Sequence, residues 1–203
     1  MAPSVKLPMP VFKGKQSVES ALYYRRSRRN YICKPLSLQK TGQMLWAAGG
    51  VGKSGVTGSN RTFPSAGATY ATEIYLVAGN IEGLEAGLYR YVCMEHSLEP
   101  RYKGDIRSGL SEAAYGQMFI AEAAASILLI AVPQRTIRRY RERGVRYIYM
   151  ETGCIAQNIY LQAEALGLGT VCVGAFDDDR IRNLIDLNPE EEPEMIMPIG
   201  AYS

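Results

Sequence analysis

The chain has 203 residues, 47% of them hydrophobic, which is enough for one domain with a buried core. Lys and Arg number 23 against 20 acidic residues, and a net charge of +3 is far below that expected of a nucleic-acid-binding domain. The single histidine, His96, excludes any triad or metal site that needs two histidines, so an enzyme of this composition needs a cofactor for demanding chemistry.

Residues 1–15 contain three prolines and no apolar core of a signal peptide, so we expect an extended arm that lies on the body or on a partner subunit. The longest strongly apolar run, 123–132, is too short to cross a membrane. The four cysteines are 60, 61 and 18 residues apart and form no metal or redox motif. We therefore expect a single domain over residues 1–203 in the cytoplasm, without a membrane partner.

Two N-cap serines predict the first two helices. From Ser17 a helix with an apolar stripe at Val18, Ala21 and Leu22 leads into the arginine-rich segment YYRRSRRNY, residues 23–31. From Ser37 a second helix, with Leu38, Met44, Leu45 and Ala48 facing inward, ends at Gly49 and Gly50. Residues 51–70 are rich in Gly, Ser and Thr and predict a long loop, which in a compact domain is often functional.

Alternating apolar residues over 72–79, 87–94 and 97–102 predict three antiparallel strands, with His96 in a hairpin loop. The later elements follow in order: one or two helices over 105–125, a fully buried strand at 126–132, an arginine-rich helix from 134 to about 143, a helix of more than 20 residues over 146–169, a short buried strand at 170–176, a helix at 177–187 and a closing strand at 194–203. The pattern is that of an α+β fold, a central mixed and mainly antiparallel sheet flanked by helices. The long helix is apolar on several sides, which is typical of the interior or of a dimer interface.

Three segments could hold a ligand, and each also has an ordinary structural interpretation. The cluster at 25–29 is either a solvated helix end or a set of guanidinium forks and a hydroxyl around a phosphate. The loop at 62–70 is either a plain turn or a place where backbone N–H groups approach a ligand. The small residues at 166–176 favour either close helix–strand packing or a planar ligand against the backbone. The 14 tyrosines, Tyr160 among them, mostly lie in predicted elements, where core packing is the usual role.

The order and spacing of the segments are more specific than any one of them. ALYYRRSRRNY, LWAAGG, PSAGATY, EIYLVAGNIEGLEAGLYRY, AAYGQMFIAEA, RYIYMETGCIAQNIYLQAEALGLGTVCVGAFDD and MPIG together resemble the nitroreductase family of FMN-dependent oxidoreductases. Within it the chain is most similar to the branch of SagB-type azoline dehydrogenases, although Cys154 stands where that branch often has histidine. The resemblance covers about residues 17–200 and implies a homodimer with FMN in clefts at the subunit interface.

The resemblance implies FMN contacts at twelve positions: Arg25, Arg26, Ser27 and Arg29 around the phosphate, ribityl chain and pyrimidine edge; Pro64, Ser65, Ala66 and Gly67 from the other subunit; and Cys172, Val173, Gly174 and Ala175 along the ring. The backbone N–H near Gly174 would point at flavin N5, and no side chain is expected to be catalytic. Family members also carry a basic residue beyond the closing strand. Here we expect Arg61, an arginine of the 135–146 stretch, or the first cluster alone to neutralise the phosphate.

The implied activity is transfer of hydride from NADH or NADPH through FMN to a small electron-poor acceptor, such as a nitroaromatic or a quinone, by a ping-pong route. An azoline dehydrogenase or oxidase acting on a peptide heterocycle is the second hypothesis, because no Lys-Tyr dipeptide occurs here. A non-enzymatic basic module is the third. The six arginines between 135 and 146 are interpreted first as an exposed helix face balanced by carboxylates. The alternatives are a site for an acidic or phosphorylated substrate, including the NADPH 2′-phosphate, and a site for nucleic acid, against which the low net charge and the lack of a known motif argue.

Overall fold

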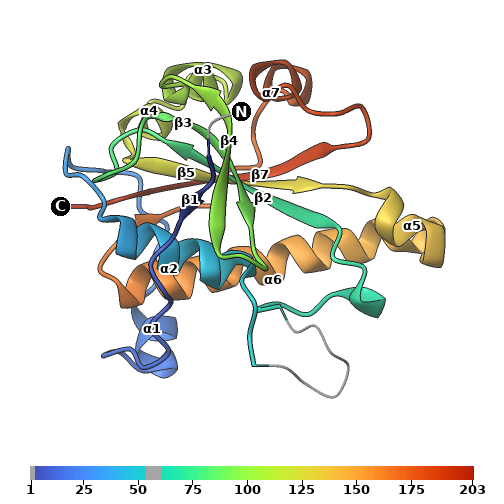
Figure 1. Ribbon diagram of the computed structural model, residues 1–203, viewed down its shortest axis with the longest axis horizontal. Helices are drawn as coiled ribbons and strands as arrows, with labels where there is room; N and C mark the ends of the chain where they lie inside the picture. Colours follow the sequence, from blue (N-terminus) through green and yellow to red (C-terminus); the bar gives the residue numbers. More distant parts are fainter. Residues whose placement is uncertain (1–2, 54–60) are drawn as a thin grey trace.

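The computed structural model describes residues 3–53 and 61–203. Its centre is a seven-stranded sheet with the order β1-β4-β3-β2-β5-β7-β6 (Figure 1). The strands are β1 (Val5–Lys6), β2 (Thr72–Ala78), β3 (Gly87–Val92), β4 (Ser97–Lys103), β5 (Ala125–Ala131), β6 (Gly169–Thr170) and β7 (Glu192–Gly200). All pairings between these strands are antiparallel, and parallel contacts in the described residues are confined to two isolated bridges, Ser27–Thr170 and Leu36–Ile81. The predicted α+β fold with a mainly antiparallel sheet is confirmed.

Helices cover both faces of the sheet. They are α1 (Val18–Tyr24), α2 (Leu38–Gly49), α3 (Arg107–Ala113), α4 (Phe119–Glu122), α5 (Gln134–Tyr140), α6 (Arg143–Ala165) and α7 (Asp178–Ile185), with a short 3-10 helix at Ala66–Ala68. In Figure 1, α2 and α6 lie below the sheet, α3, α4 and α7 lie above it, and α5 projects at one end. Residues 54–60 of the predicted loop lie outside the described residues.

The strand β5 joins the two halves of the core. All of its residues are buried, as the apolar run at 126–132 predicts. Because side chains alternate along a strand, Ile127 and Leu129 pack into the core on the α2 and α6 side, while Leu128 and Ile130 pack into the core under α3, α4 and α7. The sheet is therefore apolar on both faces in its centre.

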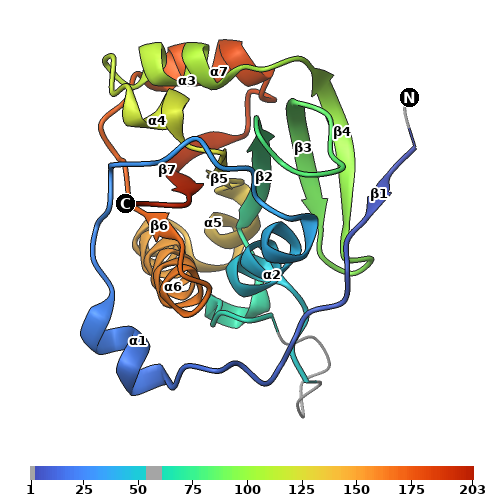
Figure 2. The ribbon, with the colours of Figure 1, turned by 90° about the vertical axis from the view of Figure 1, so that its left-hand side faces the viewer.

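The N-terminal arm lies on the body of its own chain. Strand β1 pairs with β4, with Val5 opposite Leu98, at one edge of the sheet (Figure 2). His96 lies in the turn between β3 and β4, as predicted. Its Nε2 donates to the Pro8 carbonyl at 2.9 Å, and its Nδ1 lies 2.8 Å from the Tyr91 hydroxyl. The single histidine thus fixes the arm and has no free ring nitrogen for catalysis.

Both predicted N-caps are confirmed. The Ser17 hydroxyl accepts from the Ser20 N–H, and the Ser37 hydroxyl accepts from the Lys40 N–H. The apolar stripe of α1 is only partly buried, however, because Val18 is 64% exposed and Leu22 is 51% exposed.

Among the boundaries that differ from the prediction, two have a clear structural cause. The arginine-rich helix α5 ends at Tyr140 because Arg141 adopts a positive φ of 52°. The strand expected at 170–176 shrinks to Gly169–Thr170 with one later bridge, Val173–Ile196. The physical reason is that the Cys172 N–H donates to the Tyr160 hydroxyl, not to a neighbouring strand. Across residues 3–53 and 61–203, no helix combines the length and apolar character that a membrane span requires.

Candidate functional site

The segment after α1 presents its side chains to alternate sides. Arg25 is extended at the end of α1, the Arg28 N–H donates to the Thr170 carbonyl at 3.0 Å, and Ser27 forms a bridge with Thr170. In extended chain, side chains at every second residue share a side. Arg25 and Ser27 therefore both contact Tyr160. Arg28 points to Glu164, and Arg29 lies over the Phe119 ring of α4, 5.8 Å from its centroid.

Tyr160 of α6 joins this segment to the one after β6. Its hydroxyl lies 2.9 Å from Ser27 Oγ and accepts from the Cys172 N–H at 2.9 Å. The Arg25 guanidinium lies over its ring, 5.1 Å from the centroid. Two predicted site segments are thus brought together by a residue that the sequence analysis assigned to core packing. The available signal was a tyrosine on the buried face of a long helix, where its hydroxyl needs a partner.

Residues 172–175, which we call the shelf, are fixed by hydrogen bonds at Val173 and exposed to solvent at Gly174 and Ala175. Val173 exchanges two backbone hydrogen bonds of 2.9 Å with Ile196, and the Ala175 carbonyl accepts from Gln117 Nε2 at 2.9 Å. Gly174 and Ala175 are exposed, and a Cβ added at Gly174 would meet nothing within 4 Å. Neither of their backbone N–H groups donates to an acceptor in the described ranges. The shelf can therefore offer two donors to a flat molecule laid upon it.

Cys172 stands at the start of the shelf as a thiol. Burial raises its pKa, and the hydrogen bond with Tyr160 and the charge of Arg25 only partly offset that effect. A raised pKa disfavours the thiolate. Cys172 therefore contributes a small apolar surface and not a nucleophile.

The arginines of the 25–29 segment make different contacts. Arg28 forms an ion pair with Glu164 at 2.6 Å and lies over the Tyr202 ring, so it holds the fold together. Arg26 donates to the carbonyls of Tyr23 and Arg25. Arg25 and Arg29 have no carboxylate partner among the residues that the structure describes. A cavity of about 440 Å³ adjoins Arg29 and is lined by Ser27, Arg28, Arg29, Asn30, Tyr202 and Ser203.

The third predicted segment, Pro64 to Gly67, lies at the other end of α6 (Figure 1). The Gly67 carbonyl accepts from Arg139 at 3.1 Å, and the Ser65 hydroxyl accepts from the Tyr70 N–H at 2.8 Å. The Thr62 carbonyl, two residues before Pro64, accepts from Asn158 Nδ2 of α6 at 2.8 Å, so the loop runs from Asn158 to α5. In the described ranges, no hydrogen bond joins residues 64–67 to the 25–29 or the 172–175 segment.

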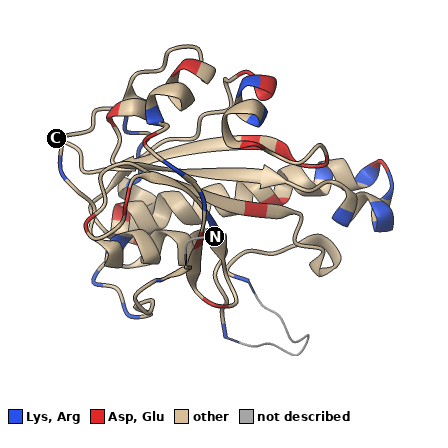
Figure 3. Cartoon of the chain, turned by 45° about the horizontal axis from the view of Figure 1, so that its top comes forward, with Lys and Arg blue, Asp and Glu red and all other residues tan. Residues whose placement is uncertain are grey.

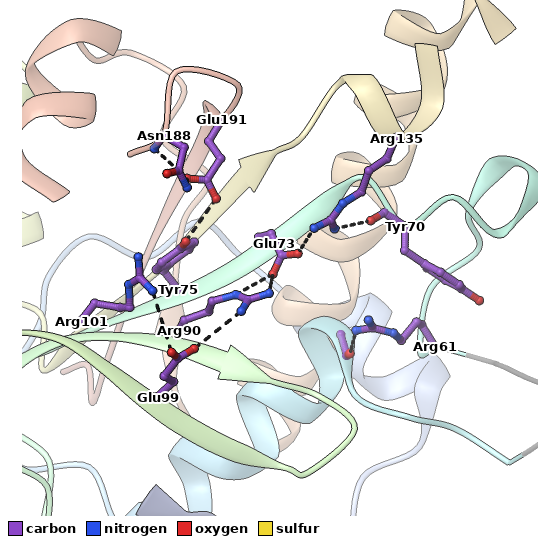
Figure 4. Close-up of polar contacts among 11 residues, drawn as sticks. Arg61, Tyr70, Glu73, Tyr75, Arg90, Glu99, Arg101, Arg135, Asn188 and Glu191 are labelled. Carbon is purple, nitrogen blue, oxygen red and sulfur yellow. Dashed lines mark hydrogen bonds and ion pairs between the residues drawn. The ribbon is translucent and has the colours of Figure 1, made fainter. Parts of the chain in front are cut away.

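Two of the other basic residues that we expected near a phosphate, Arg61 and Arg135, are engaged elsewhere. Arg61 donates to the Gly49 carbonyl at 2.8 Å and lies over the Tyr70 ring (Figure 4). Arg135 pairs with Glu73 at 2.5 Å. Neither contacts the 25–29 segment. In the described part of the chain, no group of three or more His, Cys, Asp and Glu side chains could hold a metal ion.

Comparison with known proteins assigns the chain to a family. The model of the nitroreductase family matches residues 22–201. The chain belongs to the nitroreductase family. A protein of Methanocaldococcus jannaschii named as a nitroreductase is 43% identical over 185 residues, which are 90% of each chain. A nitroreductase-type crystal structure from Ralstonia eutropha superimposes with a TM-score of 0.86 at 29% identity, covering 98% of this chain and 90% of that one.

The chain is also similar to a peptide-processing protein, as its resemblance to the SagB-type branch suggests. The microcin B17-processing protein McbC of Escherichia coli is 26% identical over 142 residues, which are 68% of this chain and 52% of that protein. Family and fold together support a flavin-dependent oxidoreductase.

Proposed function

We propose that this protein is a homodimeric FMN-dependent oxidoreductase that takes hydride from NADH or NADPH and passes it to a small electron-poor acceptor, such as a nitroaromatic or a quinone. The observation that carries the proposal is the Tyr160 junction, at which the Tyr160 hydroxyl contacts both Ser27 and the Cys172 N–H. It sets the Arg25 guanidinium and the Ser27 hydroxyl beside the open shelf at Gly174 and Ala175.

This junction fits the two ends of FMN. Arg25 and Arg29 have no carboxylate partner within the described ranges, and guanidinium forks suit a phosphate or the carbonyl edge of the pyrimidine ring. The shelf of Cys172, Val173, Gly174 and Ala175 suits the isoalloxazine face. When bound, FMN accepts and returns a hydride at N5. A backbone N–H at Gly174 directed toward that atom would stabilise the charge that develops there.

A second copy of the chain would complete the site. In one chain the loop of Pro64, Ser65, Ala66 and Gly67 forms no hydrogen bond with the 25–29 or 172–175 segments in the described ranges, and the family resemblance assigns it to the FMN of the partner. Exposed apolar side chains on α1 and α6 support a dimer: Val18 is 64% exposed, Leu22 is 51%, Tyr149 is 58% and Met150 is 57%. In the proposed dimer the loop covers the FMN of the partner and excludes water from it.

The visible spectrum of the purified protein tests the proposal. We expect a flavin spectrum after incubation with FMN, bleaching of that spectrum by NADH or NADPH, and its recovery on addition of a quinone or nitroaromatic. Protein that stays colourless with excess FMN and binds polyanions with a steep salt dependence would instead support the basic-module hypothesis.

Substitution of the first segment tests its role. Because Arg25 and Arg29 have no carboxylate partner in the described ranges, Arg25→Ala/Arg29→Ala should weaken FMN binding roughly a hundredfold, given the usual strength of charge-assisted hydrogen bonds. The circular dichroism spectrum should not change. Arg26→Ala is the matched control and should have a smaller effect, since Arg26 binds only backbone carbonyls. Full retention of FMN by the double variant would refute the assignment.

Action on an azoline ring of a peptide is the second candidate, favoured by the similarity to the microcin B17-processing protein. Oxygen consumption with a thiazoline-containing peptide, in the absence of nicotinamide nucleotide, distinguishes the two. Turnover under those conditions would favour the second candidate over a nicotinamide-dependent reductase.

A further inference from the structure

Six arginines gather at one end of the molecule. Arg135, Arg138, Arg139, Arg141, Arg143 and Arg146 lie on α5 and at the start of α6, and all are exposed. Figure 3 shows this concentration of basic residues at the end where α5 projects. Glu142 is the only acidic residue between positions 134 and 149. We call these six residues the arginine surface.

Only one residue of the arginine surface, Arg135, is paired with a carboxylate in the described ranges, whereas we first expected carboxylates to balance the whole face. Arg135 is engaged by Glu73 and by the Tyr70 carbonyl, as Figure 4 shows. Arg139 donates to the Gly67 carbonyl. The remaining four, Arg138, Arg141, Arg143 and Arg146, have no carboxylate within 4.0 Å in residues 3–53 and 61–203. Four guanidinium groups are therefore available to an external anion.

Several of these arginines stand where they do not help the fold. Arg143 and Arg146 lie in the first turn of α6, where the helix dipole favours acidic residues. Arg141 has φ of 52° and ψ of −145°, a backbone conformation that glycine adopts far more easily. Arg138 and Arg139, by contrast, lie in the last turn of α5, where the dipole favours basic residues. Fold stability therefore accounts for only part of the cluster, and the charge of the other arginines points to a ligand.

The arginine surface is tied to the loop that we place at the flavin of the partner. A Cβ added at Gly67 would lie 2.5 Å from the Tyr140 hydroxyl and 2.6 Å from an Arg139 nitrogen, so α5 packs directly on the loop. Wherever the loop goes, the arginine surface goes with it. In the proposed dimer it therefore lies beside the entrance to the partner's FMN site, and this step rests on the proposed function.

We propose that the arginine surface binds the 2′-phosphate of NADPH and so makes NADPH the favoured electron donor. NADPH and NADH differ only in that phosphate group, which carries close to two negative charges at neutral pH. Guanidinium forks recognise such a group bidentately. The phosphate takes no part in the chemical step; it places the nicotinamide, which gives its hydride to FMN.

Two measurements on the FMN-loaded protein test this inference. The first is the ratio of kcat/KM for NADPH to that for NADH, and the second is calorimetric binding of 2′,5′-ADP compared with 5′-ADP. We expect the native protein to prefer the 2′-phosphate in both by roughly tenfold or more, as two charge-assisted contacts allow. Arg138→Ala/Arg146→Ala should abolish most of that preference, and Arg138→Lys/Arg146→Lys should restore part of it.

The matched control is Lys6→Ala/Lys103→Ala, which removes the same charge from side chains that are 70% and 75% exposed on β1 and β4. It should keep the native ratio. Equal use of NADH and NADPH, or an unchanged ratio in Arg138→Ala/Arg146→Ala, would overturn the inference. Binding of duplex DNA, with equal affinity for 2′,5′-ADP and 5′-ADP, would also overturn it. The protein could instead bind 2′,5′-ADP selectively although neither NADH nor NADPH reduces its flavin. That result would support the binding role of the arginine surface and contradict the proposed function.

Discussion

Tyr160 connects two segments that are more than 140 residues apart in the chain, Ser27 and Cys172. Tyr160→Phe keeps the ring but leaves the Cys172 N–H and the Ser27 hydroxyl without their partner. We expect a loss of about 1–2 kcal/mol in the free energy of unfolding. We also expect FMN binding weakened about tenfold, because Ser27 loses its fixed position. Fluorescence titration measures the second effect. Tyr23→Phe, at a side chain that is 73% exposed, is the control, and equal FMN affinity in the two variants would contradict the role of Tyr160.

Glu194 in β7 predicts a pH dependence of stability. Burial, with the charges of Glu192 and Asp178, raises its pKa to about 7 from 4.5. The folded state therefore keeps a proton that the unfolded state has released, so this group's contribution to stability is full below about pH 4.5 and is lost as the pH rises through about 7.

Glu194→Gln cannot ionise. It should raise the free energy of unfolding at pH 8 by roughly 1–3 kcal/mol relative to the native chain, and the gain should vanish near pH 4.5. Urea denaturation at several pH values measures the difference. Glu190→Gln, at an exposed neighbouring position, is the matched control. A gain of the same size at every pH would show that packing, and not ionisation, is responsible.

At the scale of elements, one carboxylate joins β2, β3 and α5. Glu73 lies between Arg90, at 3.0 Å, and Arg135, at 2.5 Å (Figure 4). Burial alone would raise the pKa of Glu73, but the two guanidinium charges outweigh it and the pKa is lowered. The carboxylate therefore stabilises the fold at neutral pH, and the contribution is lost as the pH falls below 4.5.

Glu73→Gln should lower the free energy of unfolding at pH 7 by roughly 1–3 kcal/mol, after allowance for the partial exposure of both arginines. The thermal midpoint at pH 7 measures the loss. Glu85→Gln removes an exposed carboxylate that faces only Lys103 and should change little. If the two variants melted together, the network would carry no net stability.

Local signals predicted most elements, because their causes are local. Ser17 and Ser37 cap their helices through residues three positions away, and the apolar run at 126–132 has only one buried arrangement. The shortness of β6 could not be predicted, since it depends on Tyr160 taking the Cys172 N–H from another element. Likewise, the break of the arginine-rich helix at Arg141 follows from close packing of Gly144 against Ile137, a contact between two helices.

At the scale of the whole molecule, the proposed site draws on two copies of the chain. The sequence could indicate the 25–29 and 172–175 segments, which meet in one copy, but no single-chain signal could indicate which copy supplies the loop at 64–67. Subunit complementation tests this arrangement. Arg25→Ala/Arg29→Ala damages one contribution, and Gly67→Val, at a residue with φ of 58°, damages the other.

Each variant alone should be inactive as a homodimer. A mixed dimer, purified through two different tags, contains one site with both contributions intact and should show about half of the native activity. Dimers of one variant carrying both tags are the control. A mixed dimer without activity would mean that each site is built from a single chain.

The two outermost strands of the sheet have only two residues each, β1 and β6. A long unpaired strand edge is a template for uncontrolled pairing with other chains. Here the N-terminal arm pairs with β4, and His96 holds the arm in place through its hydrogen bond to the Pro8 carbonyl. We therefore expect the arm to protect the protein from aggregation. A chain without its first ten residues would expose the seven residues of β4 to pairing with other chains.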